Sequence, residues 1–345
     1  MIHIKWWVWI AFIALAACAP TPGAAPSGTP PVTIRVGYFP NITHSQALIG
    51  IANGMFQQAL GSRVEIAPKI FNAGPSEIEA LFAGEIDLGY IGPNPAINGY
   101  VKSKGEALRI VAGATGAGAA LIVRSDAGIS SAADLAGKRI ATPELGNTQD
   151  VAARYYISAN GLKLSEKGGN VTILPAKNAD ILTLFLKKEI DAAWVPEPWA
   201  ARLIREAGGK MLVDERTLWP DGKFVTAHLI VSAKFLKSNP DLVKQWLAVH
   251  VQVTQWIRAN PEDAKKIANK ELERLMGKGL AAQVLDDAWQ RMEVTYDPIS
   301  TSLFKSADSA FNLGFLGKSK PDLSGIYDLT LLNEVLAEKN LQAVH

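Results

Sequence analysis

The 345-residue sequence has little cysteine and little histidine: one cysteine, Cys18, and five histidines. A single thiol cannot form an internal disulfide, so the fold must be stabilised by its core. Basic residues number 35 against 33 acidic ones, a formal net charge of +2, and no basic run exceeds two residues. This excludes the concentrated basic face of a nucleic-acid-binding protein. With 48% hydrophobic residues the chain is globular rather than disordered, and long enough for one large domain or two.

Common catalytic motifs are also absent. The sequence contains no phosphate-binding loop of the Walker type, no GxSxG and no HExxH. The histidines beyond the N-terminus (His44, His228, His250 and His345) are scattered, so we expect no metal and no cofactor, although acidic side chains alone can hold calcium. His44 and His228 could still approach each other in the fold, while a lone histidine is more often structural. We therefore expect a protein that is not an enzyme.

The N-terminus carries a short apolar run, from Trp6 to Ala17, behind the single charge of Lys5. The run is too short to span a bilayer and is typical of a signal-peptide core. Leu15-Ala16-Ala17-Cys18 resembles the lipobox of bacterial lipoproteins, which predicts a signal peptide at 1–17 and acylation of Cys18. An uncleaved anchor helix or an ordinary signal peptide are the alternatives.

Residues 18–31 then form an uncharged segment rich in Pro, Ala and Gly. Such a composition cannot bury a core and behaves as a semi-extended tether. A lipid anchor followed by a tether would hold the folded part just outside a membrane, on the periplasmic or extracellular face.

From Val32 onward, strand-like and helix-like patterns alternate. Apolar strands are predicted at 32–39, 63–71 and 87–92, with amphipathic helices at 44–60 and 75–86, the latter with a capping-box spacing at Ser76 and Glu79. A second series follows, with strands near 139–143, 170–176 and 191–196 and helices at 148–162 and 178–190. This alternation predicts an α/β fold with parallel, doubly wound sheets.

In the segment LRIVAGATGAGAALIVRSDA, two strand-like pieces lie on either side of a glycine-rich turn. A later segment, HLIVSAKFL, resembles the second of these pieces and precedes a mostly helical C-terminal part. Two α/β series and two such strands predict two lobes joined by two crossings. We place one lobe at 32–122 and 229–345 and the other at 123–228. A cleft between two such lobes is where a small ligand usually binds.

The loops that follow the predicted strands are rich in Asn, Thr, Gln, Gly and Pro, and each precedes a helix: FPNITHS, FNAGPSE, YIGPNPA, PELGNTQD and WVPEPW. Ligands bind at the carboxyl ends of strands in open α/β sheets. Helix N-termini offer free N–H groups and a positive dipole end, so several of them around one cleft favour an anion. Any single loop could equally be a cap or turn.

The segments GYFPNITHSQAL, FNAGPSEIEALFAGEIDLGYIGPNPAI, ATPELGNTQD and DAAWVPEPWAARL, in this order, resemble the solute-binding proteins of bacterial ABC importers for nitrate, taurine, aliphatic sulfonates and thiamine precursors. The resemblance runs from Val32 to about Leu316. It implies a two-lobed type II periplasmic-binding-protein fold, a monomer that closes over a small anionic solute, and delivery to an ABC permease and its ATPase. A sensor that presents its closed form to a membrane receptor is an alternative.

The resemblance also implies the ligand contacts. These would be Asn41, Thr43, His44, Gly74, Ser76, Gly92, Asn94, Asn147, Thr148, Gln149, Trp194, Glu197 and His228. No arginine lies in these loops, although a doubly charged anion such as phosphate would favour one. We therefore expect a singly charged head group, in a sulfonate or taurine-like solute before nitrate, bicarbonate or a pyrimidine.

Glu197 has two interpretations. It could cap the helix that follows Pro198, or it could bind an amino group of the solute with Trp194 as a flat apolar wall or cation–π face.

Overall fold

The computed structural model describes residues 31–345, which form one compact unit. The predicted signal peptide, Cys18 and all but the last residue of the predicted tether lie outside the described residues. Within residues 31–345, no helix is both long and apolar enough to cross a membrane.

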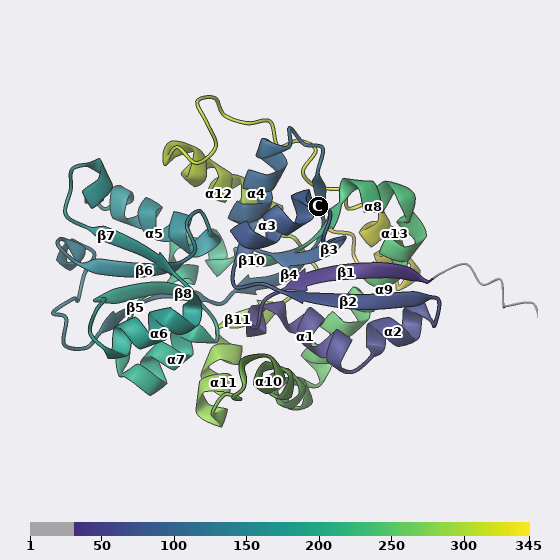
Figure 1. Ribbon diagram of the computed structural model, residues 1–345, viewed down its shortest axis with the longest axis horizontal. Coiled ribbons are helices and arrows are strands. Elements are labelled where there is room, and N and C mark those ends of the chain that lie inside the picture. The colour runs from purple at the N-terminus through teal and green to yellow at the C-terminus, as the bar shows by residue number, and fades with distance from the viewer. Residues whose placement is uncertain (1–30) are drawn as a thin grey trace, which may run out of the picture. The chain divides into compact units, whose positions relative to one another are not determined.

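Two mixed sheets organise the fold, and each carries helices on both faces (Figure 1). The larger sheet has the order β11-β4-β10-β3-β1-β2. Its strands are β1 (Val32–Tyr38), β2 (Val64–Ile70), β3 (Leu88–Ile91), β4 (Leu108–Ala117), β10 (Val225–Ser232) and β11 (Met292–Val294). Strands β2, β1 and β3 are parallel, while β10 runs antiparallel to both β3 and β4.

The smaller sheet has the order β7-β6-β8-β5-β9. Its strands are β5 (Ala119–Arg124), β6 (Arg139–Pro143), β7 (Thr172–Ala176), β8 (Ala192–Pro196) and β9 (Gly209–Asp214). Strands β7, β6 and β8 are parallel, and β5 is antiparallel to its neighbours β8 and β9. The expectation of parallel sheets is thus right for the βαβ units and wrong for the strands next to the crossings, which return in the opposite direction.

The chain passes from one sheet to the other at Gly118 and returns between Asp214 and Val225. The predicted boundaries, 122/123 and 228/229, fall inside β5 and β10, because both strands are uninterrupted apolar runs. Gly118 marks the first crossing, since its φ of 77° is unfavourable for other residues. We call 31–117 and 225–345 lobe 1, and 118–224 lobe 2.

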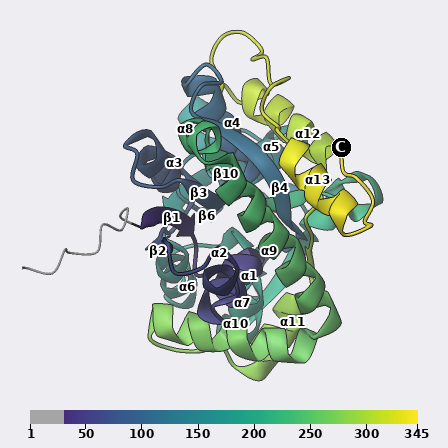
Figure 2. The same ribbon diagram turned by 90° about the vertical axis from the view of Figure 1, so that its right-hand side faces the viewer.

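Helices of lobe 1 cover both faces of the larger sheet (Figures 1 and 2). On one face, β1 packs on α1 (Ser45–Ala52), α2 (Met55–Leu60), α9 (Pro240–Ala259) and α10 (Pro261–Met276), and on the other lie α3 (Gly74–Phe82), α4 (Pro93–Lys102) and α12 (Ser300–Asn312). The remaining helices of this lobe are α8 (Ala233–Ser238), α11 (Ala282–Gln290) and α13 (Thr330–Glu338). The single helix predicted at 44–60 is two helices, because Gly54 has a φ of 67°.

In lobe 2, α5 (Thr148–Ala159) covers one face of the smaller sheet, and α6 (Asn178–Leu186) and α7 (Trp199–Ala207) cover the other. Helices of lobe 1 also contact lobe 2: α4 and α12 pack against α5, and α11 packs against α7. The carboxyl ends of β1, β2 and β3 thereby face those of β6, β7 and β8.

Candidate functional site

A small polar cavity, here called the central cavity, lies where the strand-end loops of the two lobes meet. Its volume is about 20 Å³. Of the residues predicted as ligand contacts, Asn41, Thr43, His44, Gly92, Asn147, Thr148 and Gln149 line it. The other lining residues are Phe39, Asn72, Asn178, Pro196 and Thr226. This space is only slightly larger than one water molecule, so the lobes are tightly closed here, and a larger polar group needs them to lie somewhat farther apart.

Asn72 and Asn178 were missing from the predicted contacts, although both follow strands. Asn72 lies just beyond β2, and Asn178 is the first residue of α6, just beyond β7. The strand-end rule that selected the other loops selects these two as well. The signal was therefore present in the sequence.

The first residues of α5 lie at the central cavity. Asn147 is the N-cap residue but makes no side-chain cap hydrogen bond, and its amide instead donates to Gln149 Oε1 at 2.9 Å. Asn147, Thr148 and Gln149 all line the cavity. Since N–H groups of a first helical turn have no intrahelical acceptor and carry the positive end of the helix dipole, this end of α5 can hold an anion.

Two buried polar atoms at the central cavity have no hydrogen-bond partner: Thr148 Oγ1 and Asn178 Oδ1. Buried polar groups are nearly always hydrogen-bonded, because an unsatisfied one costs about 1–3 kcal/mol. Both atoms belong to lobe 2, on the first residues of α5 and α6. A polar solute in the cavity would supply the missing partners.

The lining contains no lysine, arginine, aspartate or glutamate among the described residues. Its one titratable side chain is His44, whose pKa burial lowers to about 3, so the imidazole is neutral at physiological pH. His44 Nδ1 lies 3.3 Å from the backbone N–H of Phe39 and accepts a hydrogen bond from it. Asp150, in the first turn of α5, is paired with Arg154 at 2.9 Å, which balances its charge. The cavity is thus electrically neutral.

Gly74 and Ser76 do not line the cavity, because lobe 2 already occupies the N-terminus of α3. The Gly74 N–H donates to Asn147 Oδ1 at 3.4 Å, and the Ser76 N–H donates to Glu144 Oε2 at 3.3 Å. Glu144 also accepts from the Asn72 amide at 3.4 Å. The predicted capping box at Ser76 is wrong, since α3 begins at Gly74 and its cap comes from the other lobe.

Comparison with known proteins places this chain in a family. The sequence profile of the NMT1-like family matches residues 27–270. The chain belongs to the NMT1-like family. This is a family of solute-binding proteins of ABC importers, without enzymatic activity.

Among relatives of this NMT1-like chain is a Brucella abortus binding protein, 28% identical over 265 residues that cover 74% of this chain and 79% of the relative. The taurine-binding periplasmic protein of Escherichia coli is 26% identical over 67% of this chain and 68% of its own length. The alkanesulfonate-binding protein of Xanthomonas axonopodis pv. citri, solved bound to MOPS, superposes with a TM-score of 0.69 at 21% identity, covering 84% of this chain and 96% of that one. The fold is the two-lobed α/β fold of periplasmic binding proteins.

Trp194 does not form a wall of the central cavity in this NMT1-like protein. Its side chain is 1% exposed and packs edge-on against Tyr156, with 5.4 Å between ring centroids, in the core between β8 and α5. The indole Nε1–H donates to Glu215 Oε2 at 2.7 Å. Trp199 instead reaches lobe 1, where its Nε1–H donates to Asn41 Oδ1 at 2.8 Å. Asn41 lines the cavity, so Trp199 orients a lining residue.

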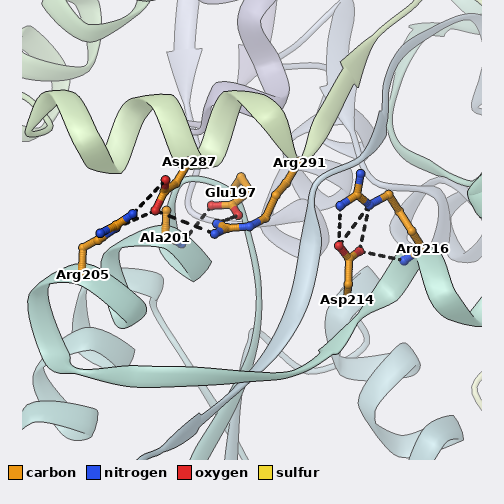
Figure 3. A network of polar contacts seen from close by, with 7 residues as sticks. All are labelled: Glu197, Ala201, Arg205, Asp214, Arg216, Asp287 and Arg291. Carbon is orange, nitrogen blue, oxygen red and sulfur yellow. Dashed lines mark hydrogen bonds and ion pairs between the residues drawn. The ribbon is translucent and has the colours of Figure 1, made fainter.

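Glu197 is 1% exposed, does not line the central cavity, and belongs to a polar network between α7 and α11 (Figure 3). Its Oε2 accepts the Ala201 N–H at 3.0 Å, and its Oε1 pairs with Arg291 Nη1 at 2.8 Å. Burial raises the pKa of Glu197, and the Arg291 guanidinium opposes that rise. The helix-cap interpretation therefore describes Glu197, with an ion pair to lobe 1 that the sequence did not predict.

His228 also lies outside the central cavity. It is fully buried in β10, with Nε2 at 3.0 Å from Pro298 O and 3.4 Å from Tyr327 Oη, and burial lowers its pKa to about 4. His44 and His228, whose approach the sequence left open, each have backbone hydrogen-bond partners of their own, as the structural interpretation of a lone histidine predicts. Asn94 lines a second, larger cavity. Among residues 31–345, no three His, Cys, Asp or Glu side chains are placed to hold a metal ion.

Proposed function

We propose that this chain is the extracytoplasmic component of an ABC importer that captures a small, singly charged anion in the central cavity, most favourably the sulfonate of an alkanesulfonate or taurine-like solute. The observation that carries the proposal is the N-terminus of α5 at a cavity without charged side chains. Helix-end N–H groups and neutral hydroxyl and amide groups suit a weakly hydrated monoanion. A dianion such as phosphate would favour an arginine.

Sulfonate oxygens match the donors that the cavity offers. Thr148 Oγ1–H has no acceptor in the protein, and a hydroxyl can rotate toward a solute oxygen. The taurine- and sulfonate-binding relatives support the same class of head group. Because the space is small, the free lobes must part to admit solute, and only the closed form contacts it from both sides. The closed form would then be presented to a permease, with acylated Cys18 holding the protein at the membrane.

Isothermal titration calorimetry with methanesulfonate, ethanesulfonate, taurine, nitrate, bicarbonate, phosphate and a hydroxymethylpyrimidine tests the proposal. We expect the sulfonates to bind and phosphate not to bind. Thr148→Val keeps the shape but removes the hydroxyl, so sulfonate affinity should fall by about 1.5–3 kcal/mol, the range for a hydrogen bond to a charged group. Thr33→Val, at an exposed position of β1, is the matched control. Tight binding of phosphate or of the pyrimidine alone would refute the sulfonate proposal.

A further inference from the structure

A second cavity, here called the side cavity, lies between α5 of lobe 2 and α12 of lobe 1. Its volume is about 420 Å³, the size of a small-molecule site. Val151, Ala152, Tyr155 and Tyr156 form the α5 wall, and Trp219 and Leu218 close one end. These residues give the side cavity an apolar and aromatic wall that the central cavity lacks, while polar side chains, among them Glu215 and Lys305, make up the rest of its lining.

The two cavities share one residue, Thr148. Its side chain stands against Gly92 of lobe 1, where a Cβ atom would clash with Thr148 Oγ1. Thr148 Oγ1 has no hydrogen-bond partner at this boundary. A modest parting of the lobes at this point would join the cavities.

The side cavity also carries one buried acid. Glu215 is 2% exposed, and its Oε2 accepts the Trp194 indole N–H at 2.7 Å. Burial raises the pKa of Glu215 to about 7, so the carboxylate gains from any further donor or cation. Across the cavity, Lys305 Nζ stands 4.7 Å from the centre of the Trp219 ring, so this ring face already carries a cation and Glu215 is the group that can bind an amino group of a solute.

We propose that the side cavity binds the body of the solute whose sulfonate lies in the central cavity. The inference rests on the proposed function and adds a solute class: sulfonates with an aromatic or other apolar body, favourably with an amino group that Glu215 accepts. The sequence suggested that Glu197 could bind an amino group of the solute. We assign this role to Glu215 instead, because Glu197 is already paired with Arg291.

Calorimetry on the full chain tests this with methanesulfonate and a series of ω-phenylalkanesulfonates with one to four methylene groups. Some member of the series should bind at least about tenfold tighter than methanesulfonate, a gain of about 1.4 kcal/mol. Ala152→Phe fills the side cavity from α5 and Ser309→Phe fills it from α12. Each substitution should remove that gain in affinity and leave the affinity for methanesulfonate within about twofold of the wild-type value. Ala337→Phe, on the exposed side of α13, is the matched control and should change neither affinity.

Glu215→Gln keeps an acceptor for Trp194 and removes the charge. It should weaken binding of the para-aminomethyl derivatives of the series by about tenfold and leave the affinity for the parent compounds unchanged. If methanesulfonate binds but no phenylalkanesulfonate gains affinity, or if filling the cavity weakens both equally, the side-cavity assignment is wrong and the proposed function stands. If no sulfonate binds, the proposed function itself fails and takes this inference with it. If aniline binds the wild-type protein but not Ala152→Phe, and its affinity is the same with and without methanesulfonate, the side cavity binds a separate ligand and the inference is overturned.

Discussion

The Glu197 carboxylate accepts a hydrogen bond from the Arg291 guanidinium across the two lobes, with 2.8 Å between Oε1 and Nη1. Asp287 lies between this pair and Arg205, at 3.9 Å from Arg291 and 2.6 Å from Arg205 (Figure 3). The Glu197 N–H also donates to Gly118 O at the first crossing. Ion pairs therefore join the lobes beside the first crossing.

Arg291→Met should destabilise the protein, because it leaves Glu197 buried without its cation. Breaking a buried pair costs about 3–5 kcal/mol, and the partial exposure of Arg291 places the expected loss near the lower end, at about 3 kcal/mol. Urea unfolding measures this. Arg63→Met, at an exposed position, is the control. Adding Glu197→Gln should recover part of the loss, and no recovery would mean that Arg291 acts by packing alone.

Glu77 makes stability depend on pH. It is fully buried in α3, neither carboxyl oxygen has a hydrogen-bond partner, and burial raises its pKa well above the ordinary value. Because the folded-state pKa is the raised one, the contribution of Glu77 is fully present below its unfolded pKa and is lost as pH rises. Glu77→Gln should therefore become progressively more stable than wild type from pH 5 to 9, by at most about 1.4 kcal/mol per pH unit.

Chemical unfolding at several pH values measures that difference. Glu79→Gln, two positions along the same helix and exposed, is the matched control and should track wild type. A constant offset between Glu77→Gln and wild type would show that Glu77 finds a partner in solution and stays ionised.

The loops after the strands could be predicted from sequence, because the carboxyl ends of parallel strands meet at one edge whatever the details of packing. This local rule selected the loops that carry Asn41, Gly92 and Asn147, and the family resemblance named these residues within them; all three line the central cavity. It failed for Trp194 because alternate residues of β8 face opposite sides of the sheet, and Trp194 shares its face with Ala192, toward α5. The sequence shows the alternation but not which face meets the cleft.

The partners of Glu197 and Ser76 could not be predicted, because they come from distant parts of the chain. Arg291 is 94 residues from Glu197, and Glu144 is 68 residues from Ser76. Each pairing depends on how the two lobes meet, and side-chain types alone allow many other pairings. A glutamate before a helix predicts a cap, which Glu197 provides, but not a second bond to the other lobe.

Cys18 carries a prediction outside the described residues. If it is acylated, Cys18→Ala should leave the chain unprocessed or release it in soluble form, because stable anchoring needs more than one acyl chain and lipoprotein processing supplies them on this thiol. Fractionation of cells into membrane and soluble pools, with mass spectrometry of the N-terminus, gives the answer. A cleaved variant that still sediments with membranes would contradict it.

Glu144 should hold the closed form, since its carboxylate accepts from Ser76 and Asn72 of the opposite lobe. Glu144→Ala should open the free protein and raise its radius of gyration in small-angle scattering, and saturating sulfonate should restore the closed value. Glu189→Ala, exposed in the same lobe, is the control. An unchanged radius in Glu144→Ala would mean that the remaining contacts between the lobes suffice for closure.

Gly92→Ala should block closure while leaving each lobe intact. Gly92 has φ −70° and ψ 159°, an extended conformation that alanine adopts without strain, so lobe 1 should fold normally. The added Cβ would clash with Thr148 Oγ1 of the opposite lobe. Sulfonate affinity should fall by at least about tenfold, and the scattering radius should stay at the open value with solute present. In Gly92→Ala/Thr148→Ala the clash with Oγ1 is gone, and the two Cβ atoms, 3.3 Å apart, require only a small shift. The hydroxyl is also gone, so closure should return while affinity stays low. Recovery of both together would show that the Thr148 hydroxyl does not bind the solute.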